Sequence, residues 1–172
     1  MPYADDLISQ ARALARADAT RPQQANLRRA VSAAYYAVFY ELCHQAVRSV
    51  LSKSEAGDAV GARLARVVTH RAVAIASKWF AEGVTNKVIQ GLRQSSPLAP
   101  SMKSLCRIII VLQDERHRAD YDQSLPFSRN EALRLIDDAE EALRVMRASS
   151  SDSDMKILFL GVLFGDSLIR NT

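Results

Sequence analysis

The sequence has little of what disulfide-bonded or metal-binding proteins need. Its two cysteines, Cys43 and Cys106, stand in apolar helical patterns rather than in a CxxC pair, and its three histidines show no ligand spacing such as HExxH. We therefore expect buried, unreactive thiols and no metal ion or other cofactor. With no secretory signal recognisable, the scarce cysteines also favour a reduced, cytoplasmic setting.

Long apolar runs and strand-like alternation are also scarce. The apolar core of the C-terminal tail, Ile157 to Phe164, is too short to span a bilayer, so we expect no membrane partner. Apolar residues instead recur at helical spacing. At 172 residues, with 48% hydrophobic residues, the chain can bury a stable core without disulfide bonds or a structural metal ion. We expect an all-α fold, an antiparallel bundle of about five helices over residues 1–149, with a linker and apolar tail over 150–172.

Several segments carry the apolar stripe of a helix. The expected helices are Tyr3 to Ala17, Pro22 to Lys53, Ala62 to Phe80, Ser101 to Tyr121 and Arg129 to Ala148. The second is apolar nearly all round, which marks a central helix, and its Tyr35, Tyr36 and Tyr40 are expected in the core. Ser128 and Glu131 form a capping box for the last helix. Residues 83–100 are expected to form a loop with one short helix, and the tail to pack as a strand or helix on the bundle or on a partner.

Positive charge is in excess and unevenly distributed. The formal net charge is +4 and the sequence pI about 9.3, with arginine supplying most of the cations. Basic residues dominate the early and middle parts, whereas acidic residues gather at Asp137, Asp138, Glu140 and Glu141. This pattern favours an anionic partner such as nucleic acid, although a solvated helix surface explains each arginine equally well.

The segment "LQDERHRADYD", residues 112–122, contains many charged side chains together with a histidine and a tyrosine, so it is the main candidate for a functional site. Helical geometry places Arg116 at the edge of the buried face, where Asp120, four residues on, can pair with it. Arg118 points elsewhere, toward Asp114, as an ordinary surface ion pair. His117 and Tyr121 share another side of the helix.

Two segments resemble the HEPN superfamily of small all-α proteins. "LRRAVSAAYYAVFYEL" (27–42) and "ERHRADYD" (115–122) are similar to the branch that carries a RAxxxAYYAxF helix and a late RxxADYD motif. The resemblance covers about Ala25 to Ala148. It implies a dimeric antiparallel helical bundle of a prokaryotic toxin–antitoxin module, often beside a minimal nucleotidyltransferase, or of an antiviral defence system. Active members are metal-independent ribonucleases in which an arginine steadies phosphate charge and a histidine four to six residues later moves a proton.

The sequence departs from that arginine–histidine pattern. The positions four, five and six residues after Arg116 are Asp120, Tyr121 and Asp122, and His117 is adjacent to Arg116 instead. An aspartate does not readily replace a histidine that changes protonation near neutral pH. Arg66 and His70 have the family spacing, but they stand in the third expected helix, away from the motif.

The candidate residues follow from the motif and the arginine excess. The catalytic candidates are Arg116, His117, Asp120 and Tyr121, and the candidate nucleic-acid-binding residues are Arg116, Arg118, Arg28, Arg29 and Arg71. In this interpretation Arg116 supplies a fork for phosphate, Asp120 orients it, and Tyr121 stacks on or bonds to a base. The structural alternative is that the same three residues only stabilise the packing of the helical bundle.

Three functional hypotheses therefore remain open. The first is an RNA- or nucleotide-directed component of a toxin–antitoxin or defence system, working as a homodimer. The second is a protein-binding scaffold or antitoxin without catalysis, with the tail Ile157 to Phe164 as its docking element. The third is an active metal-independent endoribonuclease with an atypical site built on His117 or His70.

Overall fold

The protein is built from helices alone wherever the structure describes it. The computed structural model describes residues 2–18, 20–52, 54–84, 87–93 and 97–168. In these ranges it contains eight α-helices, two short 3-10 helices and no strand, which confirms the all-α prediction but exceeds the expected number of helices. The α-helices are α1 (Pro2–Arg16), α2 (Gln24–Val50), α3 (Ala59–Ala65), α4 (His70–Ala81), α5 (Lys87–Leu92), α6 (Pro100–Tyr121), α7 (Arg129–Ala148) and α8 (Ser153–Phe164). The 3-10 helices are η1 (Glu55–Gly57) and η2 (Gly165–Leu168).

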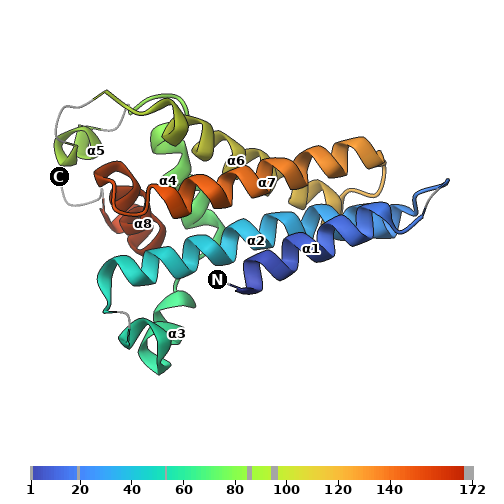
Figure 1. The fold of residues 1–172 in the computed structure, drawn as a ribbon. Coiled ribbons are helices and arrows are strands. Elements are labelled where there is room, and N and C mark those ends of the chain that lie inside the picture. The colour runs from blue at the N-terminus through green and yellow to red at the C-terminus, as the bar shows by residue number, and fades with distance from the viewer. Residues whose placement is uncertain (1, 19, 53, 85–86, 94–96, 169–172) are drawn as a thin grey trace.

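The long helices form a bundle with α2 at its centre. Helices α1, α2, α6 and α7 run along the length of the molecule, and α3 lies beside the end of α2 (Figure 1). Helix α2 contacts α1, α6, α7 and α8. Alanines supply much of its buried surface, and they allow neighbouring helices to approach closely. The nearly all-round apolar sequence of this segment therefore predicted its central position correctly.

The expected single helix from Ala62 to Phe80 was wrong, because the chain breaks there into two helices. Helix α3 ends at Ala65 and α4 begins at His70. Thr69 has an extended backbone, and its hydroxyl accepts a hydrogen bond from the Ala72 amide at 3.1 Å. A threonine that caps a helix in this way satisfies a backbone donor that the preceding turn cannot satisfy. This cap turns the chain so that α4 can pack on α6.

The C-terminal apolar segment is a buried helix of the same bundle. Helix α8 begins at Ser153, inside the expected linker, and packs on α2 and α4. Its buried apolar side chains belong to the one hydrophobic cluster that also includes the other long helices; they are Met155, Ile157, Leu158, Phe159, Val162 and Leu163. Gly161 faces the Trp79 indole, and Gly165 ends the helix with a φ of 53°. None of the helices in the described ranges is long and apolar enough to cross a membrane.

Ion pairs link the ends of the sequence and offset its uneven charge. Arg12 of α1 pairs with Asp137 at 2.6 Å and with Glu140 at 2.7 Å, both on α7. Arg147 of α7 reaches back to Asp5 at 2.9 Å and to the buried Glu41 at 3.1 Å. Two of the late acidic residues thus neutralise the early Arg12 in the fold, which offsets part of the charge asymmetry of the sequence.

Candidate nucleic-acid site

The two segments that carry the family resemblance meet in space. The Tyr36 hydroxyl on α2 accepts a hydrogen bond from Arg116 Nη2 on α6 at 2.8 Å. Ser32, one turn earlier on α2, donates to Asp120 Oδ1 at 2.6 Å. Arg116 Nε lies 2.7 Å from Asp120 Oδ2, which confirms the predicted pairing of these two residues. Four side chains from two helices therefore form one connected polar cluster.

Arg116 is held firmly but keeps part of its guanidinium unused. Its side chain is 15% exposed, and the group lies 5.4 Å from the Tyr36 ring centroid and 5.7 Å from that of Tyr121. Burial acts to lower the pKa of Arg116, but the Tyr36 hydroxyl and the Asp120 carboxylate raise it above its ordinary value. Nη1 makes no hydrogen bond to any residue that the structure describes. An oriented guanidinium with an unused edge is suited to a phosphate oxygen.

Asp120 contacts two other members of the cluster. One of its oxygens accepts from Ser32 and the other pairs with Arg116, so both are engaged. A carboxylate in this arrangement stabilises its cation and fixes the direction of the guanidinium. Asp120 is thus placed where it can orient the guanidinium, and general acid–base catalysis by its carboxyl would require one of these contacts to break.

The last turns of α6 place His117 and Tyr121 on the outer side of the cluster. Their rings lie 4.8 Å apart, as the shared helix side predicted, and Tyr121 is 67% exposed. Both side chains line a shallow surface hollow of about 480 Å³ together with Arg118 and Asp122. These groups can reach a ligand without rearrangement of the bundle.

His70 approaches the cluster from a third helix. At the start of α4, its ring centroid lies 6.0 Å from that of Tyr36 and 4.4 Å from that of Phe39, and its Nδ1 is 2.7 Å from the Tyr35 hydroxyl. Burial, with a smaller contribution from the Arg116 charge, lowers the pKa of His70. A lowered pKa favours the neutral imidazole, which is the form that accepts a proton. Arg66 lies in the turn after α3, whereas His70 begins α4, so the spacing of these two residues is not a helical one.

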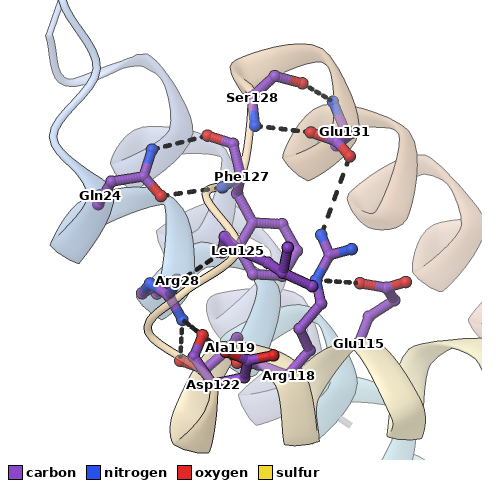
Figure 2. A network of polar contacts seen from close by, with 10 residues as sticks. All are labelled: Gln24, Arg28, Glu115, Arg118, Ala119, Asp122, Leu125, Phe127, Ser128 and Glu131. Atoms are coloured by element: carbon purple, nitrogen blue, oxygen red, sulfur yellow. Dashed lines mark hydrogen bonds and ion pairs between the residues drawn. The ribbon is translucent and has the colours of Figure 1, made fainter.

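Arg28 stabilises the end of α6. Its Nη1 donates to the carbonyl oxygens of Arg118, Ala119 and Asp122 at 3.2, 3.0 and 2.7 Å, and its Nη2 donates to that of Leu125 at 2.8 Å (Figure 2). These carbonyls belong to the C-terminus of α6 and the turn that follows it, where helical hydrogen bonding ends; that of Arg118 also accepts from the Asp122 amide. This geometry assigns the donors of Arg28 to the fold, whereas the sequence placed them in a nucleic-acid site.

Arg118 is likewise engaged within the protein. Its guanidinium lies 3.9 Å from the Phe127 ring centroid and pairs with Glu115 at 3.1 Å and with Glu131 at 3.9 Å (Figure 2). The expected pair of Arg118 with Asp114 was therefore wrong, because the loop after α6 brings Phe127 and Glu131 over the side chain. Glu131 also forms the predicted capping box with Ser128.

Arg29 and Arg71, the remaining arginines of the candidate set, are exposed. Arg29 lines a groove of about 410 Å³ between α1 and α2, whose wall also includes Ser32 and Tyr36. Arg71 follows His70 directly but lines a different hollow, beside Phe164. The structure thus brings Arg29 next to the Arg116 cluster and places Arg71 at another surface.

Comparison of this chain with protein-family models, with curated proteins and with solved structures finds no match. The functional reading therefore depends on the residues of the cluster themselves.

Sequence reasoning missed part of the cluster. It did not single out Ser32 or assign a site role to Tyr36, although both are polar groups one helical turn apart inside an alanine-rich apolar segment. These two polar side chains in an apolar helix were the sequence signal that could have indicated a site. Tyr40 was expected in the core together with Tyr35, but only Tyr35 is buried, whereas Tyr40 is 37% exposed. The side chains of α2 that are exposed or partly exposed beside the cluster include Arg29, Tyr36 and Tyr40.

The cysteines stand apart from this chemistry. Cys43 and Cys106 are free and buried, and burial raises the pKa of Cys43 to about 12. The burial of both thiols confirms the sequence prediction, and thiols held in a protonated state are poor nucleophiles. Among the described residues, no group of three histidine, cysteine, aspartate or glutamate side chains is placed to hold a metal ion.

Proposed function

We propose that this protein is a HEPN-like, RNA- or nucleotide-directed component of a prokaryotic toxin–antitoxin or antiviral defence system, and that it works as an antiparallel-bundle homodimer. The observation that carries the proposal is the direct contact between the two resemblance segments, Tyr36 with Arg116 and Ser32 with Asp120. A protein partner such as a nucleotidyltransferase belongs to the same proposal. In this site Arg116 binds phosphate through its unused edge, while Asp120 and Tyr36 hold it in place.

RNA binding by matched variants tests this proposal. We expect Arg116→Ala to weaken binding of labelled RNA at low salt and to reduce the slope of log affinity against log salt by about one, because one phosphate contact is lost. Arg116→Lys should recover only part of the affinity, since lysine keeps the charge but loses the planar fork.

The control is Arg144→Ala, which removes the same charge from an exposed pair with Glu141 on α7. It should leave both the affinity and the salt slope unchanged. Equal behaviour of the Arg116 and Arg144 variants would mean that Arg116 does not contact RNA. Thermal unfolding of each variant checks that any loss of binding occurs in a folded protein.

A second candidate function, a metal-independent ribonuclease with an atypical site, is favoured by the two histidines beside the cluster. His70 lies against Tyr36 and His117 lies against Tyr121, so each imidazole contacts a tyrosine ring that the Arg116 guanidinium also contacts. Incubation with structured RNA in EDTA tests this function. Cleavage that is lost in Arg116→Ala and in either His70→Asn or His117→Asn supports it, and intact RNA with the wild-type protein removes it.

The scaffold hypothesis loses its proposed docking element. The tail Ile157 to Phe164 was to bind a partner through its apolar residues, yet α8 buries most of them against α2 and α4. Only Phe164 among its large apolar side chains is prominently exposed. We therefore propose that protein partners bind elsewhere on the bundle.

A further inference from the structure

Tyrosine side chains gather on one part of the surface. The chain has five tyrosines, and all three that count among the exposed large hydrophobic residues, Tyr3, Tyr40 and Tyr121, lie on one connected row of rings. The Tyr3 and Tyr40 centroids are 5.1 Å apart and those of Tyr40 and Tyr36 are 6.2 Å apart. Tyr36, the middle member, is partly exposed.

Arg116 continues this row from α2 onto α6. Its guanidinium lies within 5.7 Å of the ring centroids of both Tyr36 and Tyr121, and His117 follows Tyr121 at 4.8 Å. The aromatic row, defined as Tyr3, Tyr40, Tyr36, Arg116, Tyr121 and His117, thus crosses three helices without a break. Helical spacing accounts for the pairs Tyr36–Tyr40 and His117–Tyr121, whereas the connection of these pairs to each other and to Tyr3 depends on how three helices pack.

The chemistry of this row fits unpaired bases joined by phosphates. Tyrosine rings stack on the face of any base, and such faces are accessible only where the nucleic acid is single-stranded. Arg116 offers its unused Nη1 edge in the middle of the row, and Arg29 lines the groove on the Tyr36 side. Asp120, the nearest carboxylate in the cluster, has both oxygens engaged by Ser32 and Arg116, which limits repulsion of a phosphate.

We propose that the aromatic row is a stacking track for single-stranded RNA, with bases against Tyr40, Tyr36 and Tyr121 and a phosphate on Arg116. This inference rests on the proposed RNA-directed function and names its substrate class. It adds Tyr3 and Tyr40, which the family motif residues at 115–122 do not include. It also explains why a polar aromatic pair, Tyr3 and Tyr40, is left exposed at the surface of an otherwise alanine-rich helix pair.

Fluorescence anisotropy with a short labelled oligouridine, alone and annealed to its complement, tests the track in the full chain. Tyr40→Ala and Tyr121→Ala should each weaken binding of the single strand roughly tenfold, whereas Tyr40→Phe and Tyr121→Phe should bind as the wild type does, because the ring is kept. Phe164→Ala is the matched control, since it removes an exposed aromatic ring, 50% accessible, from a surface outside the row. The duplex should bind more weakly than the single strand.

Other outcomes overturn the inference in distinguishable ways. If RNA binding depends on Arg116 but the alanine variants of Tyr40 and Tyr121 match the wild type, or if the duplex binds equally well, the track is wrong and the proposed function stands. If those variants convert a dimer to a monomer, measured by light scattering, with RNA affinity per protomer unchanged, the row is the contact with a second copy. If the wild type binds no RNA, the track and the proposed function both fail.

Discussion

Arginines of similar sequence context differ in whether their guanidinium groups are bonded within the fold or exposed to solvent, and the difference depends on what surrounds each group. Arg28 and Arg29 are neighbours on α2, yet Arg28 donates to four carbonyl groups at the end of α6 and in the loop after it, whereas Arg29 is exposed beside a groove. Arg116 combines the two situations, because it is anchored on one side and unused on another. Only the fold could reveal this division, since an arginine's partners here come from residues about ninety positions away.

We expect Arg28→Ala to lower the free energy of unfolding by about 2 kcal/mol, because several carbonyl groups lose a charged donor. Urea denaturation followed by far-UV circular dichroism measures this loss. The adjacent Arg29→Ala is the control and should leave the midpoint nearly unchanged. Equal midpoints for the two variants would show that the contacts of Arg28 contribute nothing measurable to stability.

At the scale of elements, the close contact of α8 with α4 depends on a residue without a side chain. A Cβ added at Gly161 would overlap the Trp79 indole and lie 3.0 Å from Ala76 Cβ. The sequence predicted an apolar element in this segment, but it left open whether that element is a strand or a helix. It also missed the break between α3 and α4, because the apolar period continues through residues 62–80 and a single Thr69 cap decides the geometry.

Gly161→Ala should destabilise the protein by about 1–3 kcal/mol, although alanine is the better helix former, because overpacking outweighs the gain in helix propensity. Thermal unfolding measures the effect. Gly91→Ala in α5 is the matched control, since an added Cβ there meets nothing within 4 Å, and it should be neutral or slightly stabilising. A stabilised Gly161 variant would contradict the tight contact with Trp79.

At the scale of the whole molecule, the sequence predicted what depends on pattern and missed what depends on long-range contact. The all-α class, the central position of α2, the Ser128 capping box and the Arg116–Asp120 pair follow from periodicity and spacing along one helix. The approach of Ser32 and Tyr36 to α6 depends on how helices pack, which one sequence does not specify.

One hydrophobic cluster that includes α8 predicts a single cooperative unfolding transition. Trp79, the only tryptophan, packs against Gly161, so its fluorescence reports on α8 while circular dichroism reports on the whole bundle. We expect both probes to give the same midpoint. Leu158→Ala on α8 should shift both midpoints together, by a loss of about 2–5 kcal/mol. An earlier transition of Trp79 fluorescence would instead identify residues 150–172 as a separately folding unit.

The burial of α8 against α2 also constrains the order of events during translation. Helix α2 leaves the ribosome long before α8 has been synthesised, so the apolar surface that α8 covers stays open while α3 to α7 are added. A nascent chain in this state exposes apolar surface that can associate with other molecules. The protein therefore reaches its protected form only after α8 emerges, and a pause in translation before Ser153 would leave it open to chaperones or to aggregation.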